Sequence, residues 1–101
     1  MGLLNRRSSG PSQKIEKEIT IVNRLGMHAR PAALFVRIAN GGRSEVWVEK
    51  DGEKINGQSI MGLMMLAAGP GSKLNICCEG PDADKVMEQL EQLIQRKFDE
   101  D

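Results

Sequence analysis

The chain has 101 residues, and its 14 basic residues balance its 14 acidic ones, so the formal net charge is zero. This length predicts one domain with a single small core, and the neutral balance argues against nucleic acid or a membrane surface as the main partner. Residues 1–13 lack the apolar centre of a signal peptide, and no apolar stretch is long enough to span a bilayer, so we expect a cytoplasmic protein.

The chain begins with a polar stretch that has no structural periodicity. Residues 1–13 contain two glycines, a proline and three serines, which predicts a flexible tail followed by one domain at residues 14–101. From Ile15 to Asn23 apolar and polar residues begin to alternate, which predicts a first strand with Ile19 and Ile21 facing the core.

A helix is predicted to follow His28, because Pro31 suits the first helical turn, where a missing N–H costs nothing. The run Asn40-Gly41-Gly42 ends this helix. Its apolar stripe is expected to consist of Leu34, Phe35 and Ile38. Arg37 follows Arg30 by two turns on the same face, so a basic stripe leads away from the histidine.

A β-hairpin is predicted next. The stretch from Ser44 to Glu49 has the alternation of a strand, Asp51-Gly52 is a two-residue turn, and Glu53 to Asn56 forms the returning strand. The residues expected to face the core are Val46, Val48 and Ile55.

Ser59 stands at the expected N-cap of a short helix that is apolar nearly all round and ends near Gly69-Pro70-Gly71. Because a short helix cannot bury every side, some of Ile60, Met61 and Met64 should be exposed. Methionine is frequent at adaptable binding surfaces, although a fully buried core helix would also account for the pattern.

The last strand and helix have the clearest periodicity. The strand from Lys73 to Glu79 places Cys78 inward and Cys77 outward, so these adjacent thiols are not expected to bridge each other. With a single histidine in the chain, no metal site is predicted. Asp82 is expected to cap the last helix. The apolar residues of that helix repeat every three or four positions: Val86, Met87, Leu90, Leu93, Ile94 and Phe98.

The chemistry of the chain is concentrated in residues 25–31, Leu-Gly-Met-His-Ala-Arg-Pro. Gly26 allows a tight bend, and His28 falls at the helix N-cap, beside the unpaired N–H groups of Ala29 and Arg30. Those groups and the helix dipole form a small anion site, to which Arg30 adds a planar fork of donors. A nucleophilic ring beside an anion site suggests transient phosphorylation of His28. On this stretch alone, an ordinary capping role and a general base in hydrolysis stay open, although no Ser, Cys or Asp partner is close in sequence.

The element order βαββαβα is combined with Gly-Met-His-Ala-Arg-Pro-Ala-Ala at residues 26–33 and Gln-Ser-Ile-Met-Gly-Leu at residues 58–63. This combination resembles the histidine phosphocarrier (HPr/NPr) family of the phosphoenolpyruvate:sugar phosphotransferase system, over about Lys17 to Phe98. The resemblance implies an α+β fold, an open-faced β-sandwich in which three helices cover one face of a four-stranded antiparallel sheet. It also implies that the first and last strands are neighbours at the centre of the sheet.

By this resemblance, His28 accepts a phosphoryl group at Nδ1 from phosphorylated enzyme I and passes it to IIA components, with Arg30 stabilising the phosphate. The chain is then a monomeric phosphocarrier, not an enzyme, and needs no cofactor. Ser59 resembles the family's regulatory serine, which leaves open whether a serine kinase is a further partner. The partner-binding surface implied by the resemblance comprises Leu25, Ala29, Arg30, Arg37, Ile60, Met61 and Met64.

Some features depart from the family pattern or divide its branches. Ala67 lies near a position that is often glycine. The end of the chain, residues 98–101, is similar to the nitrogen-branch paralogue NPr, whereas residues 59–63 are closer to the carbon branch. A mainly regulatory NPr-type protein and a non-catalytic docking module are the alternatives. A small hydrolase lacks a visible pair of nucleophile and base, and a catabolite-repression paralogue without the active histidine is excluded by the presence of His28.

Overall fold

The computed structural model describes residues 12–100, which form four strands and three α-helices. The elements are β1 Gln13–Thr20, α1 Ala29–Gly41, β2 Glu45–Lys50, β3 Glu53–Asn56, α2 Ile60–Met65, β4 Lys73–Gly80 and α3 Ala83–Gln95, with a short 3₁₀ helix, η1, at Lys97–Asp99. The predicted order βαββαβα is therefore confirmed. Most of the predicted tail lies outside the described residues, and Gln13, which was assigned to that tail, is already the first residue of β1.

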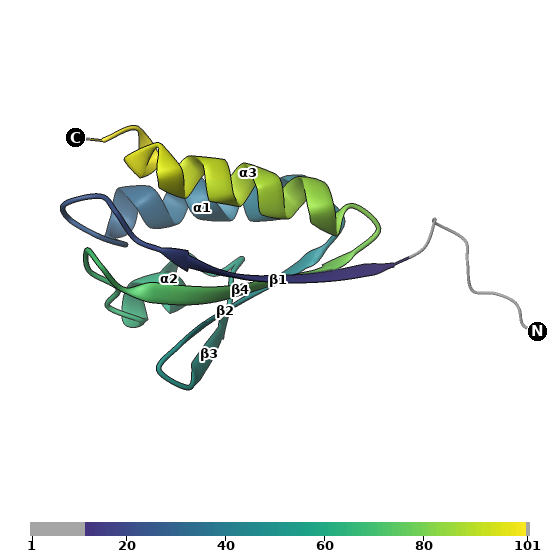
Figure 1. Ribbon diagram of the computed structural model, residues 1–101, viewed down its shortest axis with the longest axis horizontal. Coiled ribbons are helices and arrows are strands. Elements are labelled where there is room, and N and C mark those ends of the chain that lie inside the picture. Colours follow the sequence, from purple (N-terminus) through teal and green to yellow (C-terminus); the bar gives the residue numbers. More distant parts are fainter. Residues whose placement is uncertain (1–11, 101) are drawn as a thin grey trace, which may run out of the picture.

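The sheet is antiparallel with the strand order β1-β4-β2-β3. β1 and β4 are neighbours, as expected, but the expectation that both lie at the centre is wrong: β1 is an edge strand. The reason is that β4 pairs on both sides, with β1 along one edge and β2 along the other (Figure 1). The register places Ile19 opposite Leu74 and Val48 opposite Ile76, which brings core-facing side chains into adjacent rows.

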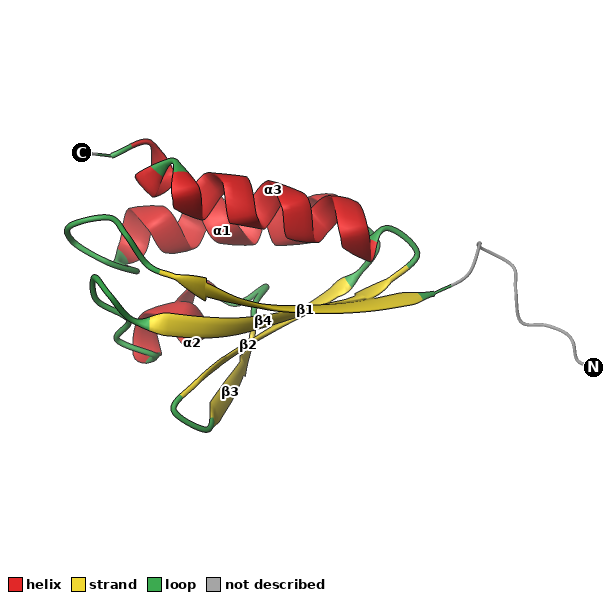
Figure 2. Cartoon of the chain, in the orientation of Figure 1, coloured by secondary structure: helices red, strands yellow, loops and turns green. Residues whose placement is uncertain are grey.

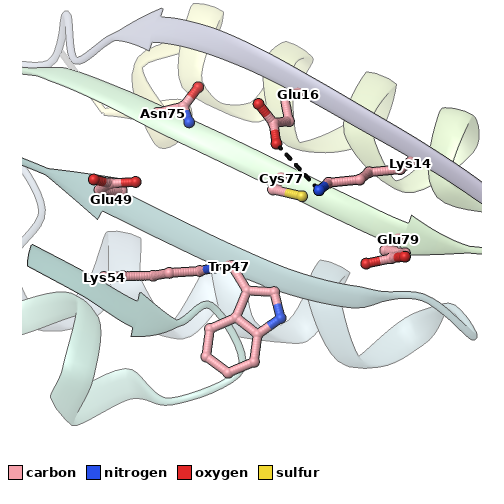
Figure 3. A pocket seen from close by; sticks show the side chains of 8 residues that line it. All are labelled: Lys14, Glu16, Trp47, Glu49, Lys54, Asn75, Cys77 and Glu79. Atoms are coloured by element: carbon pink, nitrogen blue, oxygen red, sulfur yellow. Dashed lines mark ion pairs between the residues drawn. The ribbon is translucent and has the colours of Figure 1, made fainter. Parts of the chain in front are cut away.

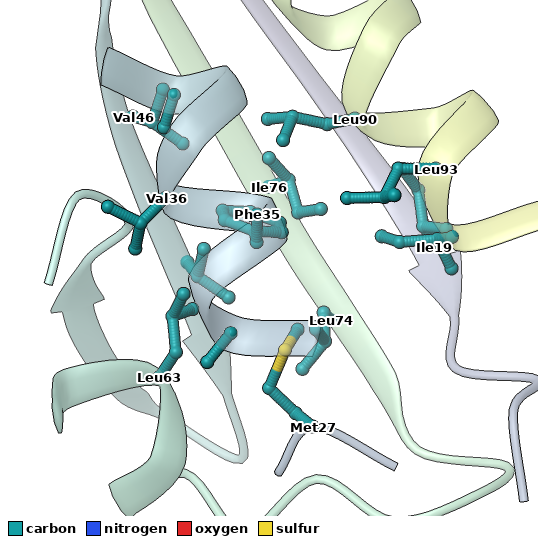
Figure 4. Packing of buried hydrophobic residues seen from close by; sticks show 14 of the residues in the cluster. Ile19, Met27, Phe35, Val36, Val46, Leu63, Leu74, Ile76, Leu90 and Leu93 are labelled. Atoms are coloured by element: carbon teal, nitrogen blue, oxygen red, sulfur yellow. The ribbon is translucent and has the colours of Figure 1, made fainter. Parts of the chain in front are cut away.

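The helices cover one face of this sheet. α1 and α3 lie side by side along it (Figure 2). α2 packs against α1 and β3. Phe35 of α1, Ile76 of β4, Leu90 and Leu93 of α3 and Leu63 of α2 belong to one buried cluster, so every layer contributes to a single core (Figure 4). Within residues 12–100, no helix is long and apolar enough to cross a membrane.

The predicted stripe of α1 is only partly correct. Phe35 is buried, but Leu34 and Ile38 are half-buried at the margin of the core. The small residues Ala32 and Ala39 are fully buried beside Phe35 instead, because small side chains allow a helix to approach its neighbours closely. The apolar residues predicted for the last helix, by contrast, are all buried.

Two helices end earlier than the sequence predicts. α2 stops at Met65, because Ala67 adopts a left-handed conformation with φ of 51°. α3 stops at Gln95, and Lys97, Phe98 and Asp99 all have φ between 54° and 60°. A left-handed residue other than glycine costs about 1–2 kcal/mol, and complete burial of the Phe98 ring offsets part of that cost. The turn redirects the chain after α3 toward the loop between β1 and α1 (Figure 1).

Asp82 occupies the N-cap position of α3, but its side chain does not cap the helix. Its carboxylate accepts instead from Ser44 Oγ at 2.6 Å and from the Arg43 backbone N–H at 3.0 and 3.1 Å. The hydrogen bond from Ser44, followed by that from Arg43, lowers the pKa of Asp82 below its ordinary value. The predicted cap is therefore a tertiary contact that ties α3 to the start of β2.

The open face of the sheet is polar. Trp47, Lys54 and Cys77 are among the residues that line a shallow hollow of about 110 Å³ on this face (Figure 3). The Lys54 ammonium lies 5.3 Å from the centre of the Trp47 ring. Cys78 points into the core on the opposite side, and burial raises the pKa of its thiol to about 11. Both thiols are free and lie on opposite faces, as predicted.

Candidate functional site

The loop between β1 and α1 is fastened to the segment that follows α2. Gly26 has a φ of 71°, and a Cβ at this position would lie 2.3 Å from the Ala68 carbonyl oxygen. The next residue, Met27, donates its backbone N–H to that same oxygen at 2.8 Å, and its side chain is buried. Only glycine permits this close approach, so Gly26 fixes the position from which α1 begins.

His28 is the N-cap residue of α1, as predicted, with an extended backbone (φ −89°, ψ −168°). Its carbonyl oxygen accepts from the Ala32 N–H at 3.0 Å, but its side chain makes no capping hydrogen bond. The N–H groups of Ala29 and Arg30 have no hydrogen-bond partner among residues 12–100. The ring is thus free of a structural capping role and lies beside two unpaired backbone donors.

The imidazole of His28 is held by a carboxylate from the far end of the chain. His28 Nε2 lies 2.9 Å from Glu100 Oε2, and the other carboxylate oxygen accepts from Asn23 Nδ2 at 3.0 Å. Asn23 is completely buried, and its Nδ2 also donates to the Gly26 carbonyl at 2.8 Å. The side chain of Glu100 is 14% exposed and that of His28 is 37% exposed, so solvent still reaches the ring.

Charged groups surround this contact. Arg24, Arg30 and Glu100 line one shallow depression of about 340 Å³, together with Leu25 and Asp99. The hydrogen bond from Asn23 is the largest influence on Glu100 and lowers its pKa below the ordinary value; burial opposes it with a smaller effect, and His28 and Arg30 lower the pKa further. The structure therefore brings His28 and Arg30 to one site, as predicted, and shows Glu100 to be an ionised carboxylate at neutral pH.

A second depression, of about 320 Å³, also borders this loop. Leu25, His28 and Met64 line it, with Met27 and the backbone of residues 67–69. The predicted exposure of α2 is correct: Ile60, Met61, Met64 and also Met65 are exposed. This apolar surface is continuous with His28 through Met64.

Ala29 and Arg37, the other two residues of the predicted partner surface, are both exposed on α1. Ser59 is the N-cap of α2, and its hydroxyl oxygen accepts from the Gly62 N–H at 3.0 Å, which confirms the predicted cap. Between the described residues Ser59 and His28 there is no hydrogen bond.

Sequence reasoning missed Asn23 and Glu100. Glu100 is 72 residues from His28 along the chain, and no local pattern joins the two. The one available signal was an asparagine at the end of an alternating apolar stretch, since a polar side chain placed there needs partners once it is buried.

An open-faced sandwich with an accessible histidine at the start of its first helix defines a class of small phosphocarrier domains. Residues 15–96 match the family described as "PTS HPr component phosphorylation site", and the chain belongs to this family. It is therefore a phosphocarrier that depends on partner enzymes and is not itself a catalytic enzyme.

The similarity to individual relatives extends over almost the whole length of those proteins. The chain is 47% identical to "HPr-like protein Crh" of Halalkalibacterium halodurans, over 82% of this chain and 99% of that protein. It is 42% identical to "Phosphocarrier protein HPr" of Treponema pallidum, over 86% of this chain and 99% of that protein. Among solved structures, HPr-C-His from Thermoanaerobacter tengcongensis matches with a TM-score of 0.83 and 45% identity, covering 86% of this chain and 98% of that one.

Proposed function

We propose that the chain accepts a phosphoryl group on His28 from phosphorylated enzyme I and donates it to IIA components of the phosphotransferase system. The observation that carries this proposal is the arrangement of the ring. Nε2 lies 2.9 Å from Glu100 Oε2, whereas Nδ1 has no hydrogen-bond partner among residues 12–100 and lies at the start of α1, open to a phosphoryl group. Nδ1 is then the nucleophilic atom.

The transfer needs little from the protein beyond positioning and charge. The lone pair of Nδ1 forms the new bond to phosphorus, and the bond between phosphorus and the donor breaks with its electron pair leaving on the donor. The N–H groups of Ala29 and Arg30 and the guanidinium of Arg30 stabilise the phosphoryl oxygens. Because the site is shallow and open, it holds the phosphate only moderately, as a carrier requires for release.

Docking is assigned to the apolar surface beside the ring. Leu25 and Met64 line the same depression as His28, and the exposed side chains of Ile60 and Met61 extend the apolar surface along α2. Methionine-rich surfaces adapt to more than one partner, which suits a protein that must bind both a donor and an acceptor. Ala29 and Arg37 extend the surface along α1.

A regulatory role is the second candidate, because the relatives include proteins named Crh as well as HPr. Ser59 supports a regulatory contribution: it caps the helix that presents the apolar surface, so a phosphate on its hydroxyl would place about two negative charges beside Ile60 and Met61. A purely regulatory protein needs no phosphoryl acceptor, however, and this chain has a histidine whose Nδ1 has no hydrogen-bond partner in the part of the chain that the structure describes. We therefore favour the HPr-type carrier, with control through Ser59, over a docking module or an NPr-type regulator.

The test is phosphorylation by enzyme I and phosphoenolpyruvate. Wild type should gain the mass of one phosphate in an acid-labile form, and His28→Ala should gain none while keeping the circular dichroism spectrum and melting temperature of a folded protein. The chain contains one histidine, so an acid-labile label that is lost in His28→Ala is assigned to that residue. Labelling that persists in folded His28→Ala would refute the proposal.

A further inference from the structure

The proposed transfer gives no role to Glu100, yet the carboxylate of this residue lies 2.9 Å from the His28 ring. Glu100 is the last described residue, and the left-handed turn of Lys97, Phe98 and Asp99 directs it back to the loop after β1. The Phe98 ring, which is completely buried, anchors that turn in the core. The carboxylate is therefore placed by packing and not by a chance surface encounter.

The hydrogen bonds define which atom donates. Asn23 Nδ2 lies within hydrogen-bond distance of two acceptors, the Gly26 carbonyl and Glu100 Oε1, so the amide nitrogen must be the atom that faces them. Glu100 is ionised at neutral pH and can only accept. A neutral His28 ring must therefore carry its proton on Nε2 to bond with Glu100 Oε2, which leaves Nδ1 without a proton.

We propose that Glu100, held in place by Asn23, is a positioning residue that keeps the proton of His28 on Nε2 and so makes Nδ1 the nucleophile. The inference deepens the proposed function and rests on it. The second consequence concerns charge. When Nδ1 bonds to phosphorus while Nε2 keeps its proton, the ring becomes positively charged, and Glu100 at 2.9 Å compensates that charge.

Charges and protons balance both when His28 accepts the phosphoryl group and when it donates that group. In the forward step no proton leaves His28, because the lone pair of Nδ1 supplies the new bond. When an acceptor attacks the phosphorus, the pair of electrons in the Nδ1–P bond returns to Nδ1, and the ring is neutral again. Arg24 and Arg30 line the adjoining depression with Asp99 and Glu100, and an arginine guanidinium gives up no proton in the transfer.

Glu100→Gln is the sharpest variant. Its amide has one oxygen and one NH₂ group, so it cannot present acceptors to both Asn23 and His28 as the carboxylate does. The buried Asn23 amide keeps its hydrogen bond to the Gly26 carbonyl, so its Nδ2 still faces residue 100 and donates to the oxygen of the new glutamine. The NH₂ group of the glutamine then faces His28 Nε2. A donor at Nε2 favours the tautomer protonated on Nδ1, which is not nucleophilic there.

The primary readout is the ¹⁵N spectrum of the neutral His28 ring, recorded without any partner. Wild type should show the tautomer protonated on Nε2, and Glu100→Gln should shift the population toward Nδ1. Glu100→Ala, which offers neither donor nor acceptor, should lose the preference without inverting it. A wild-type ring protonated mainly on Nδ1, or an unchanged tautomer in both variants, would overturn the inference.

The second readout is phosphorylation by enzyme I. We expect Glu100→Gln to lower kcat by about tenfold or more with KM unchanged, because the ring and not the docking surface is altered. Glu91→Gln is the matched control: it makes the same change at another paired carboxylate, which accepts from Lys17 at 2.8 Å and lines neither depression at the site, and it should transfer normally. If wild type is labelled on His28 and Glu100→Gln reacts equally fast, only the role of Glu100 fails; if wild type is not labelled at all, the proposed function itself fails.

Discussion

The close approach between Gly26 and Ala68 predicts how much stability the substitution Gly26→Ala removes. In Gly26→Ala, the new Cβ would lie 2.3 Å from the Ala68 carbonyl oxygen and 2.8 Å from the Cα of Gly69, so one of the two loops must move. The left-handed backbone adds about 1–2 kcal/mol, and forced overpacking adds about 1–3 kcal/mol. We expect the free energy of unfolding to fall by about 4 kcal/mol, and phosphoryl transfer to slow because the same loop carries His28.

Gly71→Ala is the control, because Gly71 also has a positive φ, 86°, but a Cβ at that position would meet no atom within 4 Å. Only the backbone cost applies there, about 1–2 kcal/mol. Urea denaturation should separate the two variants by about 2 kcal/mol or more, and thermal unfolding by about 10 °C in Tm for a domain of this size. Equal destabilisation of the two variants would refute the reasoning that the contact with Ala68 fixes the loop.

Further predictions concern residues around the site. Arg30→Ala should slow phosphoryl exchange with both partners at least about tenfold, or ~1.4 kcal/mol, with little change in stability; normal transfer with a lower Tm would make Arg30 structural. Ser59→Asp should stay folded, since it can still cap α2, but should accept phosphate from enzyme I with a higher KM; an unchanged KM would leave Ser59 only a cap. Ala67→Gly should stabilise the protein by about 0.5 kcal/mol, because relief of the left-handed strain exceeds the entropy that glycine adds to the unfolded chain, and urea denaturation measures this gain.

Local hydrogen bonding explains why much of the site could be predicted. His28 and Ser59 are N-caps whose partners lie within four residues, and Asp51-Gly52 forms its turn through two adjacent left-handed residues. Such interactions depend on spacing along the chain, and spacing is visible in a sequence. The alternation in β4 predicted its buried face for the same reason.

Tertiary competition explains the errors. Asp82 had the spacing of a cap, but its carboxylate accepts hydrogen bonds from Arg43 and Ser44, which precede β2, and not from its own helix. Phe98 continued the helical period, but it lies within a left-handed turn that follows the end of α3 at Gln95 and redirects the chain, with its ring buried. That turn brings Glu100 to His28, so the missed contact and the misplaced helix end have one cause. The periodicity of a sequence does not predict where the residues that follow such a turn will lie, because tertiary packing decides it.

Whether the His28 ring carries the phosphoryl group on Nδ1 is best measured by NMR. Chain labelled with ¹⁵N in histidine is incubated with phosphoenolpyruvate and an enzyme I shown to be active. We expect phosphorus to couple to Nδ1 of His28, while Nε2 keeps its proton against Glu100. Coupling of phosphorus to Nε2, or phosphate found only on a residue other than His28, would contradict this assignment.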